Sequence, residues 1–389
     1  MQARTKHRNM AAGILLAVFC VLTLIGFTNT SAKTIPEVET ILNSMTLHEK
    51  ICQMFISYQY TLPALDANGE NTTQTISKME TGNALKKTLE KYPIGGILYD
   101  AGSMQSHEQL TDLVATTDSY SKIPMLFTID EEGGTVARIG NSIGYARGAK
   151  LKAMGTYESQ GTQTAYDNAK FLAQNIADHG FNLDFAPVAD TNSNPKNPVI
   201  GTRAYSTNFD NAATLVASAV TGFHDGGVAC TLKHFPGHGD TSSDTHAGSV
   251  FVYKSIDEIR KNELKPFQAG IDNGADAVMI AHIVIDELGE PCLFSHEIIT
   301  DLLRNEMNFD GVVISDGLTM KAMTDEYDSE EISLRAINAG CDILLCIEDM
   351  PAAIEYITEC VENGTITEER IDESVRRILT LKYNRGILD

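Results

Sequence analysis

The stretch VACTLKH at residues 228–234 is an apolar run that ends in two ionisable residues. Seven other short runs resemble it, and they are nearly continuous in Ile, Val, Leu, Met and Phe rather than alternating with polar residues. That pattern is typical of strands buried on both faces of a parallel sheet. The seven runs are 53–57, 95–100, 124–130, 182–188, 277–282, 311–316 and 341–347.

Segments with helical periodicity lie between these runs. Ala213, Leu215, Val216 and Val220 share one side of a helix expected over 211–224. Further helices are expected over 295–307, 329–339 and 368–381. Eight β/α repeats predict an α/β fold with a single TIM (β/α)8 barrel. A doubly wound open sheet is the alternative, because topology cannot be read from one sequence. No GxGxxG or Walker pattern follows any run, which argues against a nucleotide site.

The composition limits the classes of partner. Of the 389 residues 43% are hydrophobic, as in a globular protein with a full core. The formal net charge of −22 argues against a nucleic-acid partner, because phosphate binding needs clustered Lys and Arg. The seven cysteines form no CxxC pair, which disfavours a zinc ribbon or a redox motif. We interpret most of them as small buried side chains, and one disulfide remains an open alternative.

The first residues differ in composition from the rest of the chain. Arg4, Lys6 and Arg8 precede an apolar run over 10–27, and small and polar residues follow. We interpret residues 1–32 as a signal peptide or a membrane anchor. The catalytic domain is then expected over 33–389, exported and either secreted or anchored on the outer face of the cytoplasmic membrane.

Polar side chains recur at the carboxyl ends of five runs, where a TIM barrel carries its functional residues. They are Asp130, Asp190, the pair Lys233-His234, His282 and Asp316. A single aspartate at such a place is more often a helix N-cap than a catalyst. The occurrence of several at one end of the expected barrel favours a functional site.

The fifth run opens into the loop KHFPGHGDTSSDTH at residues 233–246, which allows three chemistries. Its histidines and aspartates could bind a metal, but it has neither HExxH nor a His-x-His pair. Acyl transfer by a serine is disfavoured because the chain has no GxSxG elbow. Glycoside hydrolysis needs a carboxylate and a second group that donates a proton. Asp130 and Asp316 both lie at the expected face for such a site.

The chain resembles glycoside hydrolase family 3, in particular its bacterial β-N-acetylglucosaminidase (β-hexosaminidase) subgroup. The histidine loop is highly specific for this subgroup, and the other matching segments are moderately specific. The matching segments are MTLHEKICQMF (45–55), DEEGGTVAR (130–138), FNLDFAPVAD (181–190), NPVIGTRAYS (197–206), KHFPGHGDTSSDTH (233–246), VVISDGLTM (312–320) and SVRRILTLKY (374–383).

The resemblance implies a retaining, two-step mechanism. Asp316 would be the nucleophile that forms a glycosyl-enzyme intermediate. His246 would be the acid/base, and Asp244 would accept a hydrogen bond from its imidazole. These roles for His246 and Asp244 are physically reasonable, because an unperturbed imidazole titrates near neutral pH and a partner carboxylate fixes its tautomer.

The same resemblance assigns sugar binding to five residues. They are Asp130, Arg138, Arg203, Lys233 and His234. A structural salt bridge is the alternative interpretation of the two arginines. The chain departs from the subgroup at Glu131, where Gln or His is frequent, so that Glu131 or Glu132 could be a rival proton donor.

The resemblance therefore predicts an exo-acting glycoside hydrolase that removes terminal non-reducing β-linked N-acetylglucosamine from peptidoglycan or chitin-type fragments. We expect a carbohydrate substrate, no cofactor, no metal and a monomer. The alternatives are a β-glucosidase or a broad β-hexosaminidase on the same fold. A metallohydrolase and a non-catalytic sugar-binding protein are the alternatives from other classes.

Overall fold

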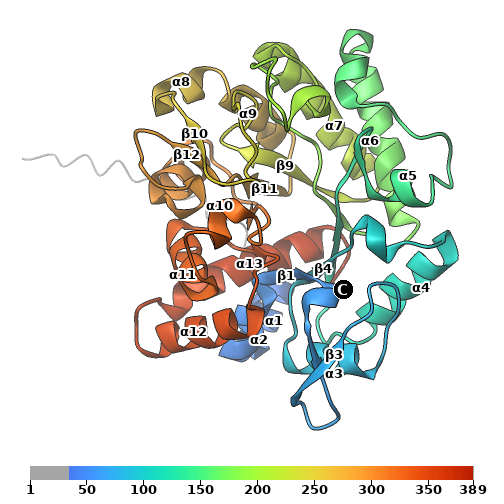
Figure 1. Cartoon of the computed structure of the whole chain (residues 1–389), viewed down its shortest axis with the longest axis vertical. Coiled ribbons are helices and arrows are strands. Elements are labelled where there is room, and N and C mark those ends of the chain that lie inside the picture. The colour runs from blue at the N-terminus through green and yellow to red at the C-terminus, as the bar shows by residue number, and fades with distance from the viewer. Residues whose placement is uncertain (1–34, 389) are drawn as a thin grey trace, which may run out of the picture. The chain divides into compact units, whose positions relative to one another are not determined.

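The computed structural model describes residues 35–388 and contains an eight-stranded parallel barrel (Figure 1). The strands follow the order β13-β11-β9-β8-β5-β4-β1-β14, and a parallel bridge from Ile314 to Ile343 joins its two ends. The predicted barrel is confirmed, and the open doubly wound sheet is wrong. The barrel strands are β1 (Phe55–Tyr58), β4 (Gly96–Leu98), β5 (Leu126–Ile129), β8 (Leu183–Asp184), β9 (Ala229–Phe235), β11 (Ala277–Ile280), β13 (Val312–Ser315) and β14 (Leu344–Leu345).

Each of the eight predicted runs overlaps one barrel strand, and only β1 and β9 extend one residue beyond their runs. Neighbouring strands are parallel throughout, as in the pairing of Ala277 with Val312 between β11 and β13. All seven residues of β9 are buried. The strands are apolar on both faces because one face packs inside the barrel and the other packs against helices.

Helices surround the strands, and α4, α6, α7 and α9 follow one another around the outside of the barrel in Figure 1. The helices expected over 211–224, 329–339 and 368–381 are α7, α11 and α13, and the segment expected over 295–307 forms a π-helix, η6 (Glu297–Glu306). The α-helices of at least seven residues are α1 (Pro36–Ser44), α2 (Leu47–Gln53), α3 (Asn83–Lys91), α4 (His107–Asp118), α6 (Thr162–Ala177), α7 (Phe209–Asp225), α9 (Leu264–Asp272), α11 (Ser329–Ala339), α12 (Met350–Glu362) and α13 (Glu368–Asn384).

Short elements occupy the loops. The polar segment 58–79 contains a small antiparallel hairpin of β2 and β3. The remaining strands are β2 (Pro63–Leu65), β3 (Asn71–Thr75), β6 (Glu131–Gly133), β7 (Val136–Ala137), β10 (Val250–Val252) and β12 (Ile283–Ile285). The short helical segments are η1 (Gln59–Thr61), η2 (Ala101–Ser103), α5 (Arg138–Ser142), η3 (Met154–Gln160), η4 (Gly201–Arg203), α8 (Ile256–Lys261), η5 (Cys292–Phe294) and α10 (Lys321–Thr324).

The segment 1–32, predicted to be a signal peptide or anchor, lies outside the described residues. Among residues 35–388, no helix combines the length and the apolar character that a membrane span needs. The six cysteines of this part of the chain are buried and unpaired, in agreement with our interpretation of most of them as small buried side chains.

Candidate active site

A pocket of about 520 Å³ lies at the carboxyl ends of the barrel strands. Seven of the eight residues singled out from the sequence line it, and the eighth, Asp244, is bonded to one of them. The residues of the pocket wall are Tyr58, Leu98, Asp130, Glu132, Val136, Arg138, Phe185, Val199, Arg203, Lys233, His234, His238, Thr245, His246, Met279, Asp316, Gly317, Thr319, Met320, Lys321, Leu345 and Cys346.

Asp130, Glu132, Lys233, Arg138 and Arg203 form an ionic network on one wall of the pocket, called here the cation–carboxylate network. The ammonium of Lys233 lies 2.7 Å from Asp130 and 2.7 Å from Glu132. Arg138 reaches Asp130 at 3.1 Å. Both guanidinium contacts of Arg203 with Glu132 measure 2.8 Å, which is a bidentate pair. The arginines are therefore salt-bridged, and they are also part of the pocket wall.

The charges of this network hold its carboxylates ionised. Burial acts to raise the pKa of Asp130, but Lys233 and Arg138 outweigh it and hold that pKa below its ordinary value. For Glu132 burial is again opposed, by Lys233 and Arg203, and the pKa falls to about 2. Glu132 therefore carries no proton near neutral pH, which argues against it as a rival proton donor.

Glu131 is fully buried and does not belong to the pocket wall. Its carboxylate accepts hydrogen bonds from the backbone N–H groups of Ile139 and Gly140 and from the hydroxyl of Tyr145. A general acid must come within hydrogen-bond reach of the substrate. Glu131, the other candidate proton donor, therefore faces away from the place where a substrate would bind.

Asp190 orders the start of the histidine loop. One of its oxygens accepts from the backbone N–H of His234 at 2.9 Å and lies 2.7 Å from Nδ1 of the same residue. Its other oxygen accepts from the backbone N–H of His238 at 2.6 Å. A carboxylate on Nδ1 leaves Nε2 of His234 as the pocket-facing nitrogen. Sequence reasoning placed Asp190 at a strand end but gave it no role.

Asp316 follows β13 and lies in the pocket wall. Its carboxylate accepts from the backbone N–H of Gly317 at 2.7 Å. Burial acts to raise the pKa of Asp316, but the imidazoles of His234 and His282 lower it below its ordinary value. His282, which the sequence places at a strand end, is buried with its Nε2 3.0 Å from the carbonyl of Gly317. Its place beside Asp316 appears only in the folded barrel.

Asp244 and His246 form a hydrogen-bonded pair at the mouth of the pocket. The Asp244 carboxylate lies 2.8 Å from Nδ1 of His246 and accepts from its backbone N–H at 2.9 Å. The side chains are 41% and 70% exposed, so Nε2 of His246 can reach a ligand without rearranging a core. Burial acts to raise the pKa of Asp244, but the N–H and imidazole of His246 hold it below its ordinary value.

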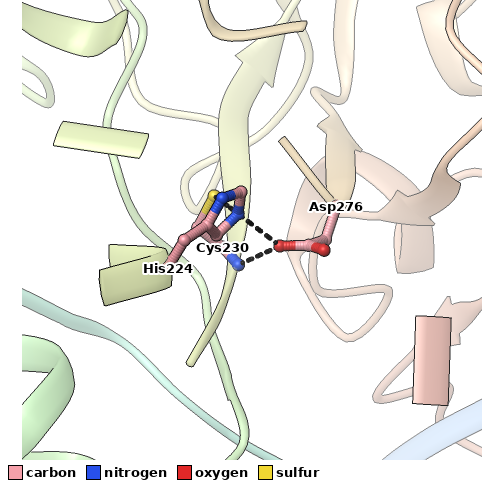
Figure 2. Close-up of side chains that lie close together, drawn as sticks. All are labelled: His224, Cys230 and Asp276. Carbon is pink, nitrogen blue, oxygen red and sulfur yellow. Dashed lines mark hydrogen bonds and ion pairs between the residues drawn. The ribbon is translucent and has the colours of Figure 1, made fainter. Parts of the chain in front are cut away.

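A second cluster lies at the opposite end of the barrel, where His224, Cys230 and Asp276 place three ligand-type atoms within 4.8 Å of one another. Figure 2 shows the imidazole of His224 and the backbone nitrogen of Cys230 directed at one oxygen of Asp276, at 3.0 Å each. Arg385 lies 2.6 Å from Nε2 of His224 and 2.7 Å from Asp276.

This cluster does not suit a metal ion. The guanidinium of Arg385 already supplies a positive charge to the imidazole and the carboxylate. Burial raises the pKa of the Cys230 thiol well above its ordinary value, whereas a metal needs the thiolate. We interpret the cluster as a salt bridge that ties Arg385, after α13, to the amino-terminal ends of β9 and β11.

Comparisons with known proteins place most of the chain in one group. The model described as "Glycosyl hydrolase family 3 N terminal domain" matches residues 46–381. Beta-hexosaminidase A of Pseudoalteromonas piscicida is 33% identical over 330 residues, which cover 77% of this chain and 54% of that protein. Beta-hexosaminidase of Stenotrophomonas maltophilia (strain R551-3) is 37% identical over 265 residues, which cover 66% of this chain and 77% of that protein.

A comparison with solved structures also finds members of glycoside hydrolase family 3. A glycoside hydrolase family 3 beta-N-acetylglucosaminidase from Paenibacillus sp. str. FPU-7 matches with a TM-score of 0.78 and 34% identity, over 88% of this chain and 63% of that one. The chain thus spans about half the length of the Pseudoalteromonas relative and less than two thirds of the Paenibacillus chain.

Proposed function

The chain belongs to glycoside hydrolase family 3, and on that premise we propose that it is an exo-acting, retaining β-N-acetylglucosaminidase. The observation that carries the proposal is that one pocket combines the anionic carboxylate of Asp316, the cation–carboxylate network and, at its mouth, the pair of Asp244 and His246. Its volume of about 520 Å³ lies in the range of small-ligand sites, ~300–1,000 Å³. The names of the relatives support N-acetylhexosaminides as substrates.

In the proposed first step an oxygen of Asp316 attacks the anomeric carbon. A glycosyl ester forms, and the bond from that carbon to the leaving-group oxygen breaks. The lowered pKa of Asp316 supports this role, because the carboxylate is anionic at neutral pH. The hydrogen bond from the Gly317 N–H orients the carboxylate and leaves its second oxygen free of protein hydrogen bonds among the described contacts.

His246 provides the proton in our proposal. Its imidazolium gives the proton on Nε2 to the departing oxygen in the first step, and the neutral ring then takes a proton from water as the water attacks the ester. That second attack releases the sugar and regenerates the Asp316 carboxylate. Asp244 on Nδ1 fixes the tautomer and stabilises the imidazolium, as the carboxylate of a catalytic triad does.

The cation–carboxylate network is proposed to bind the hydroxyl groups of the terminal sugar. Asp130 is ionised and can accept two hydroxyl hydrogen bonds, and Lys233, Arg138 and His234 add donors around it. Because three cations are paired with two carboxylates, the network has a formal charge of only +1 and presents mainly oriented polar groups. Such a wall suits a neutral, hydroxyl-rich ligand.

We further propose that the domain acts outside the cytoplasm on peptidoglycan or chitin-type fragments. The basic and apolar pattern of residues 1–32 supports export. The measurement is the mass of the amino terminus of the protein recovered from the host's extracellular and membrane fractions. Recovery in the cytoplasm alone would contradict export.

The activity is tested by hydrolysis of aryl β-glycosides that differ only at the sugar. We expect turnover of the aryl β-N-acetylglucosaminide, with the β-anomer of N-acetylglucosamine as the first product in ¹H NMR. Faster turnover of the aryl β-glucoside than of the aryl β-N-acetylglucosaminide would support a β-glucosidase instead. Release of the α-anomer would refute retention, and failure to hydrolyse any of these substrates would refute the proposed function.

A further inference from the structure

Three consecutive carboxylates after β5 face two different directions. Asp130 and Glu132 lie in the pocket wall, whereas the side chain of Glu131 is 0% exposed and faces the opposite way. Residues that alternate along a strand do this, and Glu131 is the first residue of β6. The Glu131 carboxylate accepts three hydrogen bonds and forms no salt bridge among the described residues.

The three donors to Glu131 converge from one short segment. Oε2 accepts from the backbone N–H of Ile139 at 2.7 Å, and Oε1 accepts from that of Gly140 at 3.4 Å. These two groups belong to the first turn of α5, whose N-cap residue Ala137 makes no side-chain cap. The hydroxyl of Tyr145, beyond the end of α5, donates to Oε1. Glu131 thus caps α5 from outside the helix.

The helix that Glu131 caps begins with Arg138, one residue before the Ile139 N–H. From that position Arg138 reaches Asp130 at 3.1 Å and enters the pocket wall. The backbone of Arg138 is therefore held on one side by the β6–β7 pairing, where Glu131 pairs with Ala137, and on the other by the Glu131 carboxylate.

We propose that Glu131 is a positioning residue, whose carboxylate anchors the first turn of α5 and thereby holds Arg138 against Asp130 in the sugar-binding wall. The inference rests on the proposed function, because it assumes that Arg138 and Asp130 bind the sugar. Glu131 itself does not touch the substrate. Sugar binding weakens when the anchor is lost, and the chemical step at Asp316 is preserved.

The anchor is sensitive to pH. Burial raises the pKa of Glu131 to about 7, against the lowering effect of Tyr145 and the two backbone N–H groups. The other ionisable groups that face it are Arg138, which lowers its pKa, and Asp184 on β8, whose own pKa burial raises well above the ordinary value. Below about pH 7 Glu131 takes up a proton, one of its oxygens becomes a donor, and an acceptor for α5 is lost.

The test compares an apolar and an amide substitution on aryl β-N-acetylglucosaminide hydrolysis. At about pH 8, Glu131→Leu should raise KM about tenfold with kcat changed less than about threefold, the loss expected for weakened hydrogen bonds to a charged group. Glu131→Gln keeps an acceptor for Ile139 but, like the protonated glutamic acid, loses the second acceptor, so its KM should rise less, by about threefold, to the value that the wild type reaches at low pH. Glu355→Leu, exposed on α12, is the matched control.

The dependence of KM on pH distinguishes the proposed role from a purely structural one, because a purely structural role would leave this dependence unchanged. The wild-type KM should rise as the pH falls through about 7, because the anchoring carboxylate becomes protonated. Glu131→Gln cannot titrate, so its KM should lack that rise. An unchanged KM in Glu131→Leu, or the same rise in Glu131→Gln, would overturn the proposal.

A crystallographic measurement separates this proposal from the proposed function. In Glu131→Leu the distance from Arg138 Nη2 to Asp130 Oδ2 should lengthen beyond hydrogen-bond range, whatever substrate the enzyme uses. An unchanged distance overturns the positioning role even if the enzyme is active. If Glu131→Leu does not fold, Tyr145→Phe removes one of the three donors and should shift the pH of the KM rise, and an unshifted rise counts against the proposal.

Discussion

The ammonium of Lys233 lies 2.7 Å from a carboxylate oxygen of Asp130, although 103 positions separate the two residues in the chain. Asp130 directly follows β5, and Lys233 lies near the end of β9. Parallel strands place their carboxyl ends on one face of the barrel, which brings the two side chains together. Lys233 is 2% exposed and also contacts Glu132, so the cation–carboxylate network depends on one buried ammonium.

Replacement of Lys233 by methionine should impair both stability and binding. Lys233→Met leaves Asp130 and Glu132 short of a buried partner, which should lower the free energy of unfolding by about 3 kcal/mol. It should also lower kcat/KM at least about a hundredfold, because the wall loses a charged donor. Urea unfolding and steady-state kinetics measure the two effects. Lys265→Met, at a surface ion pair with Asp210, is the control and should change stability by less than about 0.5 kcal/mol.

Asp316→Asn should abolish turnover of an aryl β-N-acetylglucosaminide. The amide has no anionic oxygen to form the glycosyl ester, so kcat should fall by more than about a thousandfold. Thermal unfolding should stay close to the wild type, because the amide still accepts from the Gly317 N–H. Asp310→Asn, an exposed aspartate before β13, is the matched control. Near-normal turnover in Asp316→Asn would assign the nucleophile elsewhere.

His246→Ala should distinguish substrates by their leaving groups. Substrates with activated aryl leaving groups need little protonation, so their kcat should fall much less than that of a natural glycosidic linkage, where general acid catalysis contributes about 10²–10⁴-fold. Asp244→Asn should act in the same direction with a smaller loss, because the imidazole loses its orienting carboxylate. Equal losses on both substrate types would mean that another group supplies the proton.

Treatment with a chelator should leave the activity unchanged. Asp130 and Glu132 in the pocket wall are paired with Lys233, Arg138 and Arg203, which already neutralise them. At the other end of the barrel Arg385 occupies the cluster of His224 and Asp276. Incubation with EDTA, followed by gel filtration and assay, should keep kcat/KM within about twofold. A loss that Zn²⁺ restores would favour the metallohydrolase alternative.

Lys382 should make stability depend on pH. It is fully buried, donates to Gln53 at 2.8 Å, and burial lowers its pKa to about 7. Between about pH 7 and pH 10 the unfolded chain binds a proton that the folded chain does not, so Lys382 makes the free energy of unfolding rise with pH. The slope from this one group is at most about 1.4 kcal/mol per pH unit.

The check for Lys382 is chemical unfolding across that range. The difference in free energy of unfolding between the wild type and Lys382→Met should change with pH between about 7 and 10, because only the wild type carries the titrating amine. Lys261→Met, exposed in α8, should show a constant difference. A constant difference for Lys382→Met would mean that its amine stays charged in the folded barrel.

Much of the fold could be predicted because its signal is local and repeated. All eight barrel strands fall, to within one residue, inside runs that are apolar at nearly every position, and such runs need burial on both faces. The hairpin of β2 and β3 was missed because β3 is polar and mostly exposed and β2 has only three residues, so no hydrophobic period marks it. The π-helix η6 was expected as a helix, but its wider winding leaves no signal in the apolar spacing.

The site was predictable to the extent that its residues lie at strand ends or in the histidine loop. Asp316, Asp130 and Lys233 could be placed on one face from barrel topology alone. Glu131 and Glu132 could not be told apart, because adjacent carboxylates in the sequence diverge only when a strand alternates their directions. The structure makes Glu132 a charged member of the wall and Glu131 a buried cap.

The sequence by itself determined the barrel, the family resemblance and the set of chemical groups at the strand ends, because these depend on hydrophobic period and on residue type. The tertiary structure alone decided which charges meet. The pairing of Lys233 with Asp130, the place of His282 beside Asp316 and the raised pKa of Glu131 all depend on distance and burial. Electrostatic effects arise between side chains that are far apart in the chain, so only the closed barrel sets them.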